Sequence, residues 1–226
     1  MVVSTDMVVD DSVLAESCRV LRSRLDLSGL PPLTRAVTEA VLCATADFDF
    51  VTDLMCDEAI LAAGVRAIEA GVPVLVDSPL VVAGITDCPV ICKATEPLAM
   101  RLARTTGITV AAAGVRLGFG VAGPGSVWVV GEAPDALGEI LRRVTEPALV
   151  IGVPAGLSGA AEAKDELRAS GVPALTTLSE KGGPVVAVAA FRALLRAATD
   201  LWGRLAAGRP QQGTEGRDRH HRAALL

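Results

Sequence analysis

The chain has 226 residues and a formal net charge of −5, from 26 acidic and 21 basic side chains. This length suits one large domain, and the acidic balance argues against a nucleic-acid-binding protein, which needs concentrated basic charge. Hydrophobic residues make up 51% of the chain but aromatic residues only 3%. We therefore expect a single domain over residues 1–207, with a core built mainly from Ala, Val and Leu.

The end of the chain differs in composition from the rest. Residues 208–226 are polar and basic, and they contain both histidines, His220 and His221. Such a composition predicts a disordered tail. The predicted domain then has no histidine, which limits its acid–base and metal chemistry.

Targeting and membrane signals are not apparent. We find no run of about 18 apolar residues, which a membrane helix needs, and the N-terminal stretch lacks the basic region of a secretory signal. The odd count of five cysteines predicts free thiols in a reducing compartment. We therefore expect a cytoplasmic protein that does not interact with membranes.

The predicted elements begin with helices and continue as an alternation of strands and helices. Helices are expected over 11–27, 34–45 and 57–70. The later helices are expected over 79–85, 96–120, 133–145, 159–170 and 184–206, and the strands over 73–77, 89–93, 126–131, 148–153 and 173–178. Strands that are apolar throughout indicate a parallel sheet covered on both faces. Right-handed crossovers then favour a three-layer α/β/α sandwich with a mainly parallel, doubly wound sheet of about five strands.

Two glycine-rich stretches are candidate ligand loops. The stretch GFGVAG at 118–123 matches G-x-G-x-x-G, but a helical pattern precedes it and a strand follows, which reverses the order of a nucleotide loop. The stretch IGVPAGLSGAAEAK at 151–164 has the order strand, glycine loop, helix. Its helix start can hold a carboxylate or phosphate beyond the carboxyl end of a strand. The alternative is a glycine turn needed only for packing.

Other polar groups are expected at the same edge of the sheet. Asp77 ends the first predicted strand and either caps the next helix or contacts a ligand. The stretch KGG at 181–183 precedes the last helix and either reaches that edge or forms a simple turn.

The cysteines allow several interpretations. Cys88 and Cys92 are four residues apart, and without a histidine in the domain a zinc site would need further converging ligands, so we expect no metal. Cys18 and Cys56 fit helices as small hydrophobic side chains. Cys43, in the stretch VLCATADFDF, is either a buried filler, a nucleophile or a substitute for another catalytic residue.

Several stretches carry a family resemblance when they are taken together. They are VLCATADFDF (41–50), AGVPVLVDSPLVVAGIT (70–86), VVGEAPDAL (129–137), IGVPAGLSGAAEAKDEL (151–167) and KGG (181–183). In this order they resemble the precorrin-8X methylmutase family of cobalamin biosynthesis. The fourth stretch is the most specific, because it is similar to the family pattern Pro-Val-Gly-Phe-x-Gly-Ala-x-Glu-Ser-Lys.

The resemblance implies a homodimeric three-layer α/β isomerase that needs no cofactor. The family moves a methyl group from C-11 to C-12 of a corrin precursor, giving hydrogenobyrinate or its cobalt form, and a catalytic histidine assists proton transfer. Cys43 stands at the histidine position. The substrate-binding residues that the resemblance implies are Thr45, Asp77, Thr109, Gly156, Gly159, Glu162, Lys164, Lys181, Gly182 and Gly183.

The chain departs from the family at chemically important positions. Two family arginines are replaced by Ala40 and Val110, the serine after the two glycines by Pro184, and the histidine by Cys43. Loss of arginine removes bidentate contacts to substrate carboxylates.

The replacement of histidine by cysteine has the largest chemical consequence. A thiol titrates near 8.5, against about 6.5 for histidine, so it is a poorer general acid at neutral pH. As a nucleophile it needs a lowered pKa, whereas Asp47, Asp49 and Asp53 would raise that pKa if they lie close.

Three hypotheses follow for the activity. The chain is a methylmutase that uses Cys43, a diverged enzyme that uses Cys43 covalently on a less anionic substrate, or a non-catalytic protein that binds a tetrapyrrole or a partner.

Overall fold

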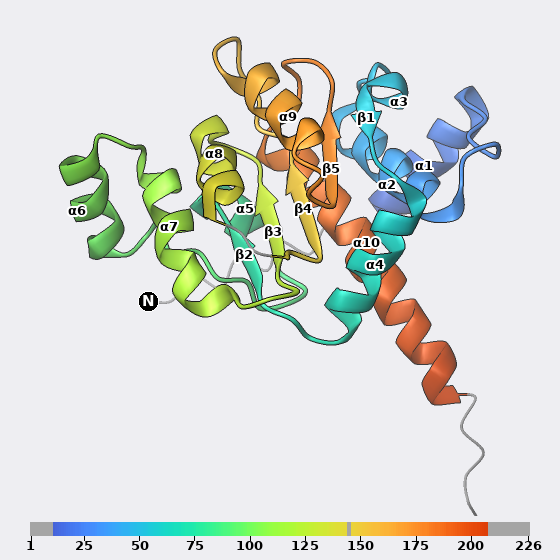
Figure 1. Ribbon diagram of the computed structural model, residues 1–226. Helices are drawn as coiled ribbons and strands as arrows, with labels where there is room; N and C mark the ends of the chain where they lie inside the picture. The colour runs from blue at the N-terminus through green and yellow to red at the C-terminus, as the bar shows by residue number, and fades with distance from the viewer. Residues whose placement is uncertain (1–10, 144–145, 208–226) are drawn as a thin grey trace, which may run out of the picture.

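A five-stranded sheet forms the centre of the computed structural model, which describes residues 11–143 and 146–207 (Figure 1). The strand order is β1-β5-β4-β3-β2; the four strands β2 to β5 are parallel, and β1 pairs with β5 in the antiparallel direction. The bounds are β1 Leu54–Met55, β2 Val74–Val76, β3 Val127–Val130, β4 Leu149–Gly152 and β5 Ala174–Thr177. The prediction of a mainly parallel sheet of about five strands in an α/β fold is confirmed.

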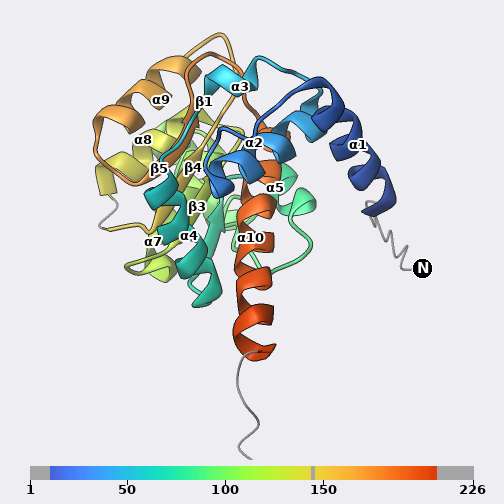
Figure 2. The ribbon, with the colours of Figure 1, turned by 90° about the vertical axis from the view of Figure 1, so that its right-hand side faces the viewer.

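Helices cover both faces of the sheet. The described helices are α1 Asp11–Arg24, α2 Pro32–Thr45, α3 Phe50–Asp53, α4 Glu58–Glu69, α5 Pro79–Gly84, α6 Pro97–Thr106, α7 Val110–Ala122, α8 Pro134–Arg143, α9 Ala160–Ala169 and α10 Pro184–Ala207. Helices α2, α4, α5 and α10 pack on one face, and α7, α8 and α9 on the other. Helix α1 packs against α2 at one end of the molecule (Figures 1 and 2), and α6 packs against α7 at the other (Figure 1).

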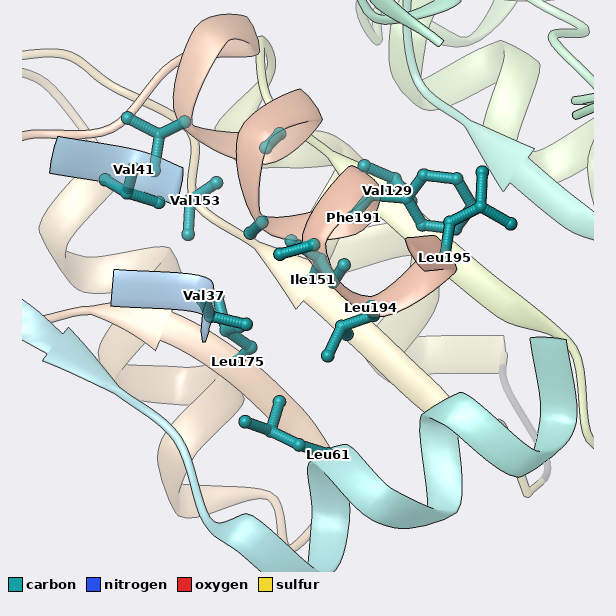
Figure 3. Packing of buried hydrophobic residues seen from close by; sticks show 14 of the residues in the cluster. Val37, Val41, Leu61, Val129, Ile151, Val153, Leu175, Phe191, Leu194 and Leu195 are labelled. Carbon is teal, nitrogen blue, oxygen red and sulfur yellow. The ribbon is translucent and has the colours of Figure 1, made fainter. Parts of the chain in front are cut away.

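The core alternates along each strand. On β3, Val127 and Val129 contribute to the cluster under α10, whereas Trp128 and Val130 contribute to the cluster under α7 and α8. Because both faces are buried, the strands are apolar at every position. Figure 3 shows the side chains beneath α10, where Phe191 is fully buried.

Two predicted elements differ from the structure. The helix expected over 96–120 is divided into α6 and α7, because Gly107 ends α6 with a φ of 70° and Thr109 caps α7. The strand expected over 89–93 is wrong, since this segment is described as a single bridge between Ile91 and Leu75. The short strand β1 was not predicted because two residues carry too little pattern.

Within residues 11–143 and 146–207, no single helix is long and apolar enough to cross a membrane. Helices α6 and α7 reach the required length and apolar composition only as a pair, which is bent by 116°. The predicted tail, 208–226, lies outside the described residues. The proposed domain limit near residue 207 therefore stays a prediction.

Candidate functional site

A cavity of about 630 Å³ lies between α1, α2, α5 and residues 184–196 of α10. These helices lie next to one another in Figure 2. Helix α2 contributes Ala40 and Cys43, which lie one turn apart on the same face. The close approach of α5 to α10 requires Gly84, since a Cβ there would lie 2.6 Å from Cγ2 of Val188. The cavity wall is predominantly apolar and includes Cys43, the predicted catalytic residue.

Cys43 lies against a second thiol. Its Sγ atom is 3.3 Å from Sγ of Cys18, on α1. An ion pair between Arg22 and Glu39, with 2.7 Å between Nη2 and Oε2, links α1 to α2 on the same side. The interpretation of Cys18 as helix filler is therefore incomplete, because this side chain is the direct neighbour of Cys43.

Burial is the largest of the causes that together raise the pKa of the Cys43 thiol to about 12. The Cys18 thiol and the Glu39 carboxylate act in the same direction, and the Arg22 guanidinium opposes them. Asp47, which was considered as a cause of such a shift, is not among these groups. The thiol is thus protonated at neutral pH, which disfavours its use as a thiolate nucleophile.

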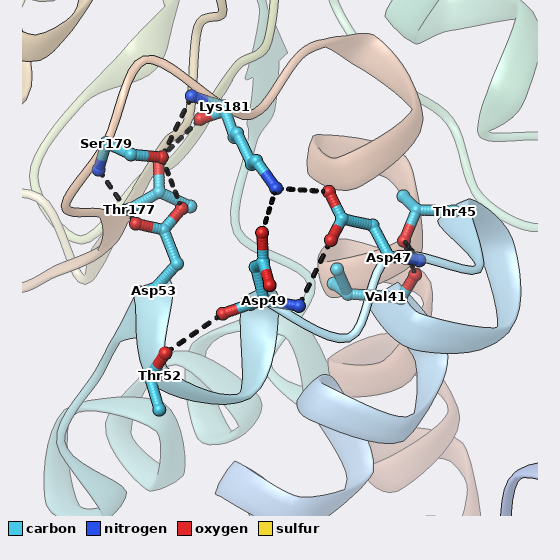
Figure 4. Close-up of polar contacts among 9 residues, drawn as sticks. All are labelled: Val41, Thr45, Asp47, Asp49, Thr52, Asp53, Thr177, Ser179 and Lys181. Atoms are coloured by element: carbon cyan, nitrogen blue, oxygen red, sulfur yellow. Dashed lines mark hydrogen bonds and ion pairs between the residues drawn. The ribbon is translucent and has the colours of Figure 1, made fainter.

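The aspartates that follow Cys43 hold the loop between β5 and α10 (Figure 4). Lys181 Nζ lies 2.7 Å from Oδ2 of Asp47 and 2.5 Å from Oδ2 of Asp49. Asp53 accepts hydrogen bonds of 2.8 Å from the backbone N–H and the hydroxyl of Ser179. Asp47 and Asp49 of the stretch VLCATADFDF, together with Asp53, therefore hold the segment that leads into α10.

Lys164 holds the same loop from the other side. This fully buried side chain of α9 donates from Nζ to Thr177 Oγ1 at 2.8 Å, to Lys181 O at 2.9 Å, and to Ser179 O. Burial lowers the pKa of Lys164. Its ammonium is occupied by protein acceptors.

Gly182 allows the loop to pass close to β4. A Cβ at this position would lie 2.2 Å from the carbonyl oxygen of Val153. Gly183 then donates its N–H to the same oxygen at 2.7 Å. Pro184, the next residue, begins α10 and lines the cavity.

Asp77 organises the turn between β3 and α8. Its buried carboxylate accepts backbone N–H groups of Gly131, Glu132 and Ala133 at 2.8–3.2 Å. Burial raises the pKa of Asp77, and these hydrogen bonds act in the opposite direction. The cap of the following helix, α5, is Ser78.

The remaining predicted substrate residues have local roles. Thr45 donates to Val41 O at 2.8 Å, and Thr109 caps α7 and bonds Asp135 at 2.9 Å. Gly156 and Gly159 lie in the loop before α9, and Glu162 is an exposed residue in the first turn of this helix.

Of the predicted site residues, Cys43 lines the cavity and the ten substrate residues do not. Their contact with substrate stays a prediction. The structure also brings Arg192 and Arg196 to the cavity, which the sequence analysis missed. The available signal was a pair of arginines four residues apart in a stretch of the final helix, 184–198, that is otherwise apolar.

Comparisons with known proteins agree in pointing to one family. The family model described as precorrin-8X methylmutase matches residues 12–197. The chain is 36% identical over 163 residues to cobalt-precorrin-8 methylmutase of Methanocaldococcus jannaschii, covering 70% of this chain and 77% of that protein. It is 33% identical over 195 residues to precorrin-8X methylmutase of Pseudomonas aeruginosa, covering 81% and 93%.

A solved structure supports the same assignment. Precorrin-8X methylmutase from Thermus thermophilus superposes with a TM-score of 0.76 and 31% identity, covering 84% of this chain and 97% of that one. The chain therefore belongs to the precorrin-8X methylmutase family.

Proposed function

We propose that this protein is a cytoplasmic isomerase that moves a methyl group from C-11 to C-12 of a corrin precursor, giving hydrogenobyrinate or its cobalt form. The observation that carries the proposal is the position of Cys43: the residue at the family's histidine position lines a largely apolar cavity of about 630 Å³. An apolar wall suits the flat face of a macrocycle and removes water from it.

The role of Cys43 in this reaction follows from its protonation. With a pKa raised to about 12 by burial, the thiol is a weak acid that keeps its proton near neutral pH. It can donate a hydrogen bond or a proton to the macrocycle, but it is poorly suited to covalent attack. This favours an isomerase over the diverged enzyme that would use Cys43 covalently.

A second function is favoured by the contact between the two thiols. Cys18 lies 3.3 Å from Cys43 and is one of the causes of its raised pKa, and a raised pKa weakens proton donation. A protein that binds hydrogenobyrinate without turnover fits this arrangement, because the cavity does not depend on a strong acid.

The experiment compares turnover by the natural chain with turnover by two Cys43 variants. Purified protein is incubated with precorrin-8X, and the absorption change of hydrogenobyrinate formation is recorded for the natural chain, Cys43→Ala and Cys43→His. Turnover by the natural chain that falls in Cys43→Ala supports the isomerase. Absence of turnover in the natural chain, together with activity in Cys43→His, contradicts it and supports the binding protein.

We also propose that the protein is a homodimer. Leu80 and Val185, which line the cavity, are 62% and 57% exposed. The rim of the cavity therefore presents apolar surface to solvent in a single chain, and a second copy would cover it.

A further inference from the structure

We propose that Arg192 and Arg196 form a carboxylate-binding subsite that determines how an anionic macrocycle is oriented in the cavity. The nature of the ligand rests on the function proposed above. The subsite itself rests on the placement of two guanidinium groups in the wall of one cavity.

The two arginines lie on one face of α10. They are four residues apart, so their side chains are neighbours on the helix surface. Within the described part of the chain, they are the only charged residues that line the cavity. The opposite wall, from α2, contributes Ala40, Cys43 and Ala44, which are uncharged at neutral pH. Among the residues that line the cavity, those that attract a bound anion by charge therefore lie on the α10 side.

Arg192 is held in place by an acidic neighbour. Its Nε and Nη2 atoms lie 3.0 and 2.8 Å from Oδ2 of Asp87. The fork of the guanidinium has five N–H donors, so the Nη1 donors and one Nη2 donor are available beside this contact. Asp87 thus fixes the orientation of Arg192 and neutralises part of its charge.

Arg196 supplies charge that no ion pair offsets. Its side chain is exposed, and it forms no ion pair with any other residue that the structure describes. A guanidinium recognises a carboxylate through two parallel hydrogen bonds. Arg196 therefore binds a carboxylate at the cavity rim, and Arg192 binds a second one a turn deeper towards Pro184.

The test measures the affinity for hydrogenobyrinate and for its methyl ester by titration followed by visible absorption spectroscopy. The proteins are the natural chain, Arg196→Ala, Arg196→Lys and, as a control, Arg101→Ala on the exposed face of α6. We expect Arg196→Ala to weaken binding of the free acid on the order of tenfold. Arg196→Lys retains part of the affinity, and Arg101→Ala binds like the natural chain.

The ester separates recognition of carboxylate from recognition of the ring. We expect it to bind the natural chain and Arg196→Ala with equal affinity, and added salt to weaken binding of the acid only. An unchanged affinity of Arg196→Ala for the acid, in a variant with an unchanged melting temperature, overturns the subsite. If the natural chain converts precorrin-8X in that case, the proposed function stands. Arginine-dependent binding without turnover supports the subsite and overturns the isomerase.

Discussion

At the scale of single residues, the contact between Cys43 and Cys18 determines the chemistry available in the cavity. A thiol that is half-buried, next to another thiol and near Glu39, is stabilised in its neutral form. A histidine at this position would change charge near neutral pH, whereas this thiol does not. Any proton transfer by Cys43 must therefore start from the protonated state.

The raised pKa of Cys43 predicts slow alkylation. In a Cys56→Ala background, where Cys43 is the one cysteine of the tryptic peptide 36–66, we expect iodoacetamide to label it slowly at pH 8 and faster as the pH approaches 12. Adding Cys18→Ala lowers the pKa of Cys43, because Cys18 is one of the groups that raise it. Mass spectrometry of that peptide gives the rates; fast labelling at pH 8 without the second change would contradict the burial argument.

The short distance between the two thiols predicts that Cys18 and Cys43 can form a disulfide. With 3.3 Å between the Sγ atoms, we expect oxidised glutathione at pH 9 to convert the two thiols to a disulfide and release two molecules of reduced glutathione. In the Cys56→Ala background, non-reducing mass spectrometry should find peptide 1–19 linked to peptide 36–66. Stable glutathione adducts on both cysteines, with no linked peptides, would show that α1 and α2 do not hold the thiols together.

At the scale of elements, the loop between β5 and α10 influences the cavity because it positions the start of α10, which forms part of the cavity wall. Lys164 holds it from α9, and Asp47 and Asp49 hold it through Lys181. The loop leads directly into Pro184 and hence into the wall of the cavity.

The buried ammonium of Lys164 predicts a large effect of its removal. Lys164→Met removes hydrogen bonds to three oxygen atoms of the loop, and we expect it to lower the free energy of unfolding by about 2–3 kcal/mol. The matched control is Lys93→Met, which removes a partly exposed pair with Glu96 and should cost less than about 1 kcal/mol. Urea denaturation followed by circular dichroism measures both, and equal effects would contradict the structural role of Lys164.

The contact between α7 and α8 predicts that the free energy of unfolding falls at low pH. The buried carboxylate of Glu139 contacts Arg116, Arg142 and Arg143, and its pKa is lowered from 4.5 to about 2, with Arg116 as the largest cause. A lowered carboxyl pKa contributes stability that is complete above the unfolded pKa and is lost as pH falls towards 2.

The variant Glu139→Gln isolates this contribution. We expect the natural chain to be more stable than the variant at pH 7, and the difference in the free energy of unfolding to shrink as the pH falls from about 5 to 2. A difference that stays constant over this range would show that the carboxylate charge contributes nothing.

At the scale of the whole molecule, the proposed homodimer predicts a measurable mass. One chain has a mass of 23.2 kDa, and light scattering after size-exclusion chromatography should give about twice this value. We expect Leu80→Glu with Val185→Glu to shift the mass towards a single chain, because charge at an apolar interface is costly. The control Leu157→Glu changes a residue that is 98% exposed away from the cavity, and its mass should not change.

The elements were predictable where their patterns are long or strictly apolar. Strands β2 to β5 and most helices follow from β-branched runs and helical periodicity. The break between α6 and α7 at Gly107 was missed because a glycine within a helical pattern does not by itself decide between a kink and an end.

The sequence by itself determined the α/β class and the family resemblance, and it singled out Cys43 as the predicted catalytic residue, because these depend on local pattern and residue identity. Only the tertiary structure decided that Cys18 lies against Cys43, that Lys164 and Asp77 hold loops, and that Arg192 and Arg196 face the cavity. The physical reason is that these relations join segments far apart in the chain, and the crossing of helices over the sheet determines which side chains meet. A sequence motif identifies candidate residues, but the burial of these residues and their contacts in the fold determine their pKa values.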